Sequence, residues 1–275
     1  MPDVFADLHT HTHCSDGGHA PADLVQRASE AGLRVLAVTD HDTVAGVAAA
    51  QQEATQHALQ VVTGVELSVS VEETEVHLLG YGFDVEDPGL TAWLEDMQAA
   101  RRERAREILD RLDALGVPVD EATLRAEVGA SASVGRPHIA AALVGEGHVP
   151  TRRAAFEQYL GEGQPAYVTK PPAPAADVLT LLHEAGGIGV LAHPGHWTSS
   201  RTIRRLVEVE LDGIEVTHPA HDASLRQYYT RLARGYGLLR TGGSDYHGPS
   251  TDRNTGLGDL GMTRQEWERF RGVLA

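Results

Sequence analysis

The stretch over 4–17, VFADLHTHTHCSDG, passes from a short apolar run into three histidines and an aspartate. The apolar part predicts a β-strand over 4–8. Residues two apart on a strand point to the same side, so His9 and His11 are expected to present both imidazoles at its carboxyl end. Imidazole together with carboxylate suits Zn, Mn or Fe. An isolated His-X-His pair is equally compatible with two buried, hydrogen-bonded histidines, so the remaining strands must decide between these interpretations.

Six further apolar runs of β type follow along the chain, over 35–39, 61–69, 76–83, 188–192, 213–217 and 238–242. Helical patterns lie between most of them. The segment 21–31, for example, has a proline at its start and Gly32 just past its end, a typical pair of helix start and stop signals. Strands and helices in alternation predict an α/β fold, a mainly parallel sheet with its helices outside.

The middle of the chain differs, because 90–167 contains no convincing strand. A long, charge-rich helix is expected over 93–115, followed by shorter helices over 121–128, 136–144 and 152–160. We therefore predict that residues 1–89 and 171–275 form a barrel. Residues 90–170 are predicted to form a helical insertion subdomain that covers the active-site mouth. A closing helix is expected over 262–273.

Composition limits the classes of function. The formal net charge of −16 argues against binding of long duplex DNA or RNA, although divalent cations would make a local site positive enough for a small anion or a strand end. No apolar run is long enough for a membrane span. The N-terminus lacks the pattern of a secretory signal, so the cytoplasm is the expected compartment. The single cysteine, Cys14, excludes an internal disulfide and a thiolate metal site.

Several of the predicted strands end in, or carry, a titratable residue. These titratable residues are Asp40, His41 and Asp42 after the second strand, Glu66 within the third, His77 in the fourth, His193 after the fifth, and Asp245 and His247 after the last. Asp42 is expected to cap a helix. A lone Glu66 in an apolar strand needs a metal or an arginine as partner. In α/β barrels the carboxyl ends of the strands meet at one mouth, so these groups predict a centre for two or three divalent ions.

This pattern resembles the PHP family, the polymerase and histidinol phosphatase superfamily. The matching segments span nearly the whole chain, over 7–17, 38–43, 64–67, 77–81, 192–195 and 243–248. The resemblance implies a distorted (β/α)7 barrel of PHP type. It also implies a metal-dependent phosphoesterase with two or three ions, of which Mn is expected and Zn or Fe are alternatives.

Carried over residue by residue, the resemblance implies three metal positions. One ion would be held by His9, His11, Glu66 and Asp245. Glu66 would bridge to a second ion held by His77 and His193, and a third ion would take Asp16, His41 and His247. In histidinol phosphatase-like members a histidine often stands at the position of Asp16, so histidinol phosphate is the less expected substrate.

The predicted insertion is similar to a subgroup that includes 3′,5′-nucleoside bisphosphate phosphatases and 5′-to-3′ exoribonucleases acting on short RNA. The similar segments are 135–140 and 159–170. The implied reaction converts adenosine 3′,5′-bisphosphate to AMP. The expected partners are therefore a small nucleotide or a short RNA end, with no long duplex DNA and no membrane.

Basic residues of the insertion are candidate substrate contacts. Arg136 at a helix start could hold phosphate oxygens together with backbone N–H groups, and Lys170 is the single lysine of the chain. Arg101 and Arg104 share a helix face and could meet a second phosphate. The acidic residues beside them make a solvated, salt-bridged face the stronger interpretation for this pair.

The expected mechanism is in-line attack by a metal-bound hydroxide bridged at Glu66, with the general acid unassigned. His138 and His218 could contact substrate or donate a proton, or could be structural. His221 is expected to be a surface or structural residue. The alternatives are a histidinol-phosphate-type phosphomonoesterase, a nuclease acting on strand ends, and a non-catalytic metal-binding domain.

Overall fold

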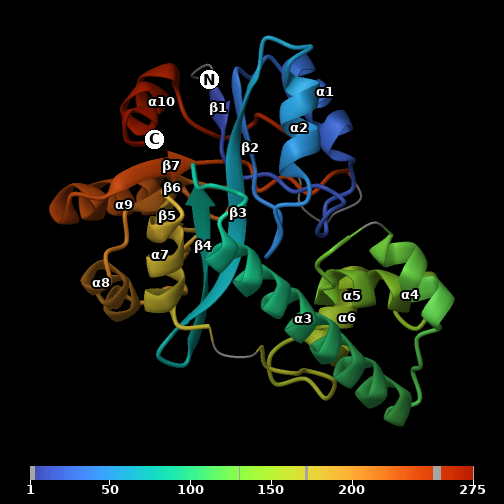
Figure 1. The fold of residues 1–275 in the computed structure, drawn as a ribbon. Helices are drawn as coiled ribbons and strands as arrows, with labels where there is room; N and C mark the ends of the chain where they lie inside the picture. Colours follow the sequence, from blue (N-terminus) through green and yellow to red (C-terminus); the bar gives the residue numbers. More distant parts are fainter. Residues whose placement is uncertain (1–3, 130, 171–172, 250–254, 275) are drawn as a thin grey trace.

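The computed structural model describes residues 4–129, 131–170, 173–249 and 255–274. Within these residues one sheet contains seven strands in the order β1 to β7 (Figure 1). Their bounds are β1 Ala6–Asp7, β2 Val35–Val38, β3 Gln60–Val71, β4 Thr74–Tyr81, β5 Ile188–Leu191, β6 Gly213–Thr217 and β7 Leu239–Gly242. Strand β4 runs antiparallel to both neighbours, and the other pairs are parallel.

The sheet curls until the segment after β1 meets the last strand. The Leu8 N–H donates to the Gly242 carbonyl oxygen at 3.2 Å, and the His11 N–H donates to the Tyr246 carbonyl oxygen at 2.9 Å. These bonds nearly close the sheet and confirm the expected distorted seven-stranded α/β barrel. The first strand is shorter than predicted, because the backbone after Asp7 leaves regular pairing where it enters the histidine-rich stretch.

Six helices of the described chain surround the barrel (Figure 1). They are α1 Pro21–Glu30, α2 Val47–Ala54, α7 Ala175–Glu184, α8 Ser200–Glu208, α9 Ala223–Tyr236 and α10 Arg264–Phe270. In α1, proline occupies the first turn and Gly32 follows with a φ of +85°, as the start and stop signals predict. The short α10 packs buried Trp267 and Phe270 under one end of the barrel, where the Tyr81 ring meets Phe270 edge-on.

The alternation of side chains along the strands separates an apolar half of the barrel from a polar half. On β3, Val62 joins the inner cluster that also contains Leu79 and Tyr81 of β4. Glu66 lies on the same side of β3 as Val62, and His77 lies on the same side of β4 as Leu79, because strand side chains repeat every two residues. Apolar residues therefore fill one end of the barrel, and titratable residues are gathered at the other.

A helical segment separates β4 from α7 and lies beside the barrel (Figure 1). It contains α3 Pro88–Ala114, α4 Glu121–Val128, α5 Arg136–Gly145, α6 Arg152–Ala155 and the π-helix η1 Phe156–Leu160. Its own apolar cluster includes Ile108, Leu112, Ile139 and Leu143. Helix α3 begins earlier than predicted, because the Asp87 carboxylate caps the Leu90 N–H at 2.8 Å. Residues 171 and 172, where the second part of the predicted barrel begins, lie outside the described residues.

Asp42 is not the helix cap that the sequence suggested. Helix α2 starts five residues later, with Gly46 before it. The Asp42 backbone has a φ of +50°, a left-handed conformation that is strained for a residue other than glycine. Its carboxylate accepts the Ser68 N–H at 2.8 Å and the Arg101 Nε–H at 2.6 Å. The residue therefore joins the loop after β2 to β3 and α3.

Candidate metal centre

The structure brings all nine predicted metal ligands together at the polar end of the barrel. Among these nine residues, three groups have ligand atoms within 4.8 Å of one another, and they consist of His9, His11, Glu66 and Asp245; of His41, Glu66 and His77; and of His11, Asp16, His41 and His247. The remaining candidate, His193, joins them through its Nε2 atom, 2.8 Å from Glu66 Oε1.

Glu66 is the centre of this arrangement. Its Oε2 atom lies 3.2 Å from a ring nitrogen of each of three histidines, His9, His11 and His41. Its Oε1 atom lies 2.7 Å from His77 Nδ1 and 2.8 Å from His193 Nε2. Five imidazoles thus converge on one carboxylate that is 1% exposed. Such crowding is unusual for a hydrogen-bonded core and is what a carboxylate shared between cations requires.

The donor atoms fit divalent metal ions. Both ring nitrogens of His11 and the Nδ1 atom of His41 are buried without a hydrogen-bond partner in the described part of the chain. Buried polar atoms rarely stay unpaired. Metal–ligand distances of about 2.0–2.2 Å would place an ion between nitrogen and oxygen atoms that are 3.2 Å apart. Nitrogen and oxygen donors without thiolate suit Mn, Zn or Fe.

Charges around the site favour the ligand forms of its carboxylates. Burial by itself would raise the pKa of Glu66, but His41, His9 and His77 hold that pKa well below its usual range. The same balance, with His247 as the main partner, holds the pKa of Asp16 well below its usual range. Burial lowers the pKa of His193, which favours the neutral, metal-binding imidazole.

The backbone is strained at two of the candidate ligands. His193, directly after β5, has a φ of +26°, and Asp245, after β7, has a φ of +50°. Left-handed conformations of this kind cost free energy in residues with a Cβ and gather at functional sites. The turns they create bring the Asp245 carboxylate to 3.2 Å from His11 Nε2.

Asp16 reaches the centre from a turn rather than from a strand. Its carboxylate lies 3.4 Å from His247 Nε2 and 3.9 Å from His41 Nε2. The helical segment holds this turn: the Cys14 carbonyl accepts from the Ala132 N–H at 3.0 Å and the Ser131 hydroxyl at 3.2 Å, and the Ser15 carbonyl accepts from His138 Nε2 at 2.9 Å. The position of Asp16 therefore depends on residues more than a hundred positions away.

Glu215 was missed by the sequence interpretation. It lies in β6, is fully buried, and places Oε1 3.0 Å from His9 Nδ1, while Oε2 accepts the His193 N–H at 2.8 Å. A carboxylate on the outer nitrogen of a histidine fixes its tautomer and leaves the other nitrogen for a metal. The signal was available: Glu215 is a lone acid in an apolar strand, as Glu66 is.

His138 and His218 use both ring nitrogens for internal bonds. His138 Nδ1 accepts the Gly135 N–H at 3.0 Å, so its Nε2–H donates to Ser15. His218 Nδ1 accepts the Ala220 N–H at 3.0 Å, which leaves Nε2–H to donate to Asp245 Oδ2 at 3.2 Å. Each ring nitrogen of the two histidines thus has a partner within the protein, and His218 also lines a cavity beside the metal ligands.

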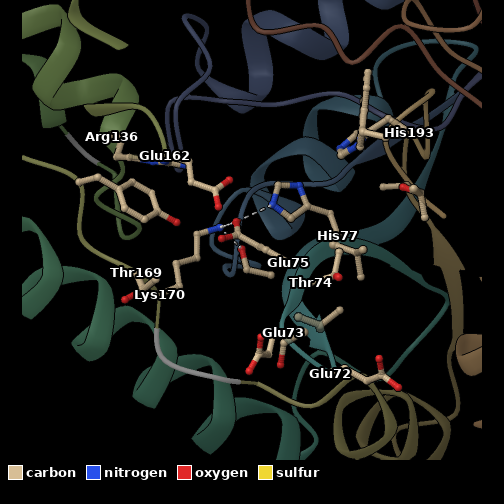
Figure 2. A pocket seen from close by; sticks show the side chains of 18 residues that line it. Glu72, Glu73, Thr74, Glu75, His77, Arg136, Glu162, Thr169, Lys170 and His193 are labelled. Carbon is tan, nitrogen blue, oxygen red and sulfur yellow. Dashed lines mark hydrogen bonds and ion pairs between the residues drawn. The ribbon is translucent and has the colours of Figure 1, made fainter. Parts of the chain in front are cut away.

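A cavity of about 760 Å³ opens beside the metal ligands and is lined by His77, His193, Arg136 and Lys170 (Figure 2). Lys170 Nζ donates to Glu75 Oε1 at 2.5 Å and to the Ser68 hydroxyl at 3.1 Å. The Arg136 guanidinium lies over the Tyr167 ring, 5.5 Å from its centroid. Two of the predicted substrate contacts thus face one cavity that also reaches the metal ligands.

The other two predicted contacts, Arg101 and Arg104, are buried, and the expectation of a solvated face is wrong. Each is 7% exposed. Arg101 donates to Asp42 and, through Nη2, to the Ser68 hydroxyl at 3.0 Å, so it lies behind Ser68. Arg104 Nε donates to the Val168 carbonyl at 2.8 Å, while its Nη2 is buried without a partner in the described part of the chain. Helix periodicity predicted a shared face but not the packing that covers it.

Comparisons with known proteins show what this chain is similar to. A model of the PHP domain matches residues 7–121. A 5′-3′ exoribonuclease of Haemophilus influenzae is 37% identical over 96% of this chain and 98% of its own length. A 3′,5′-nucleoside bisphosphate phosphatase of Chromobacterium violaceum is 34% identical over 88% of this chain and 87% of its own.

Two further proteins widen the comparison. A phosphoribosyl 1,2-cyclic phosphate 1,2-diphosphodiesterase of Eggerthella lenta is 36% identical over 89% of this chain and 95% of its own length. A crystal structure from Bifidobacterium adolescentis, described as a candidate metal-dependent phosphoesterase, has a TM-score of 0.91 and 29% identity over 100% of this chain and 98% of that one.

Among the described residues, no helix is both long enough and apolar enough to cross a membrane. The relatives match far beyond the segment covered by the family model. The chain therefore belongs to the PHP family, and it is a hydrolase of phosphoric esters.

Proposed function

We propose that this protein removes the 3′-phosphate from nucleoside 3′,5′-bisphosphates and that it also shortens short RNA from the 5′ end. The observation that carries the proposal is that one cavity is lined both by candidate metal ligands and by basic residues of the helical segment. Residues that converge on Glu66 line one side, and Arg136 and Lys170 line the other. A substrate with two phosphates matches both, and relatives along nearly the whole chain bear names for these two activities.

The nine candidate ligands would hold two or three divalent ions, with Mn as the proposed metal and Zn or Fe as alternatives. Such ions polarise a phosphoryl group and lower the pKa of water. The protein would contribute the geometry: Glu66 shared between sites, His9 fixed by Glu215, and Asp245 fixed by His218.

The second phosphate would bind at the basic residues of the helical segment. Burial lowers the pKa of Lys170, and burial together with the nearby Arg136 lowers the pKa of Arg104 to about 10. A phosphate beside Arg136 and Lys170 would relieve this crowding of cations. Arg101 would support this group from behind Ser68. Residues 90–170 would thus act as an insertion subdomain that covers the mouth of the barrel.

The test is release of phosphate or nucleotide by the purified protein with Mn²⁺, with a chelated sample as control. The substrates are adenosine 3′,5′-bisphosphate, AMP, histidinol phosphate, a ribose 1,2-cyclic phosphate 5-phosphate and a short 5′-phosphorylated RNA. Metal-dependent turnover of the bisphosphate with AMP left intact supports the proposal, and stepwise shortening of the RNA supports its second part. Preference for histidinol phosphate or the cyclic phosphate overturns it.

A further inference from the structure

Trp197 is the most exposed large apolar side chain in the described part of the chain, at 66%. It follows β5, four residues after the candidate ligand His193. It lines the 760 Å³ cavity that contains Arg136 and Lys170. It also lines a second cavity of about 550 Å³, whose walls include His41, Glu66, His77, His193 and Asp245. The indole therefore lies on the wall common to the metal ligands and the basic residues.

The indole rests on a glycine. A Cβ atom built on Gly195 would come within 2.4–2.5 Å of three carbons of the six-membered ring of Trp197. Gly195 also has a φ of +54°, which disfavours any side chain. One part of the ring system is thus packed against bare backbone, and the exposed fraction shows that much of the remainder faces solvent.

The backbone under the indole is held firmly. The Gly195 N–H donates to His221 Nε2 at 3.0 Å, and the Tyr229 hydroxyl donates to the Gly195 carbonyl at 2.6 Å. His221 in turn donates from Nδ1 to the Val216 carbonyl at 2.9 Å. His221 and Tyr229 are each 1% exposed, so His221 is not a surface residue but part of a buried support. A surface fixed in this way before binding loses little conformational entropy when a ligand stacks on it.

The chemistry of the cavities indicates what would stack there. A nucleotide with one phosphate at the metal ligands and the other at Arg136 and Lys170 has its sugar between them. The base, attached to another carbon of that sugar, then projects toward the side wall of the cavity. Trp197 lies on the wall shared by both ends. The other aromatic side chain on the wall, Tyr167, already lies under the Arg136 guanidinium. Stacking on an aromatic ring suits any base, because every base has a π-face.

We propose that Trp197 is the base-stacking residue of the substrate site. This inference rests on the proposed function, because it takes the substrate to be a nucleotide. It adds that the protein recognises the base by its flat face rather than by its hydrogen-bonding edge. Purine substrates, which offer the larger face, are then preferred over pyrimidines.

The experiment compares adenosine 3′,5′-bisphosphate with ribose 3,5-bisphosphate, which lacks the base. Trp197→Ala lowers kcat/KM for the nucleotide by about 5- to 150-fold, the range for loss of one base–aromatic stack, and leaves the sugar bisphosphate unaffected. Trp197→Phe retains most of the activity on the nucleotide. Tyr236→Ala, a change at a 45% exposed aromatic residue at the end of α9, is the matched control and changes neither substrate. Equal loss on both substrates, or no loss on either, overturns the proposal.

A binding measurement separates this inference from the proposed function. AMP is expected to quench the tryptophan fluorescence of the metal-loaded protein, and ribose 5-phosphate, which has no base, is not. The quenching reports on Trp197, because Trp267 is buried and Trp93 is packed against the core. The quenching disappears in Trp197→Phe. If wild-type protein quenches with AMP but turns over no bisphosphate, the proposed reaction fails and the stacking site stands. If AMP does not quench while the bisphosphate is hydrolysed, the stacking site fails alone.

Discussion

Glu66 and Asp16 are both buried carboxylates of the candidate metal centre, but the chain supports them differently. Glu66 lies within β3, paired with β4 on one side and bridged to His41 on the other. Asp16 lies in a turn whose carbonyls are held by Ser131, Ala132 and His138 of the helical segment. The metal positions around Glu66 are therefore a property of the barrel, whereas the position at Asp16 depends on contact between barrel and helical segment.

Glu66→Gln is expected to have the largest effect, because this one side chain is shared by two of the metal positions. Phosphate release falls by more than about 100-fold, beyond what the loss of an outer partner of a ligand causes. Metal analysis of the purified variant shows less of the two ions that Glu66 would share, while the ion at Asp16 is retained. A variant that keeps its full metal content would contradict the central place given to Glu66.

Asp16→Ala is expected to remove one ion per chain and to leave the others. Activity falls by about 10- to 100-fold, less than in Glu66→Gln, because the barrel ligands stay in place. Metal content and phosphate release are measured on the same preparation. Loss of all ions together would show that the two carboxylates are not independent.

His138→Ala has a smaller effect that is specific to the same position. The Ser15 carbonyl loses its donor next to Asp16. The apparent Kd of the ion at Asp16 therefore rises by about 10-fold, while the ions at the other positions are unaffected. His138→Gln restores binding in part, because an amide can accept from Gly135 and donate to Ser15. A metal titration gives the constants, and thermal melting checks that both variants are folded.

Ser131→Ala is the matched control for His138→Ala. The Ala132 N–H still donates to the Cys14 carbonyl, so the same Kd rises by only about 2- to 5-fold. If Ser131→Ala and His138→Ala weaken all ions equally, the helical segment supports the whole barrel rather than the Asp16 turn.

The sequence predicted the barrel and the gathering of its ligands for physical reasons that the structure makes plain. Short apolar strands that alternate with helices leave few architectures, and strand ends of a barrel meet at one mouth. Glu66 and His77 were recognisable because a titratable side chain in an apolar strand requires a partner.

The remaining features depend on contacts between distant segments. Arg101 was expected in solvent, because nothing in the sequence of its helix shows that the chain folds Asp42 against it. Asp42, which has a left-handed backbone, accepts a hydrogen bond from Arg101. Glu215 was overlooked beside Glu66 although it carries the same signal. The support of Gly195 by His221 and Tyr229 joins three elements whose sequences give no sign of one another.

The reversed strand β4 has a kinetic consequence. Because β4 runs against its neighbours, its hairpin with β3 stands at the edge of the cavity and brings Glu72, Glu73 and Glu75 to the entrance (Figure 2). Glu72 is paired with Arg201 and Glu75 with Lys170, so an incoming dianion meets mainly the repulsive long-range field of a chain with net charge −16. Screening by salt weakens that long-range repulsion. Encounter with a dianionic substrate is therefore expected to be slower in dilute buffer than at the ionic strength of a cell.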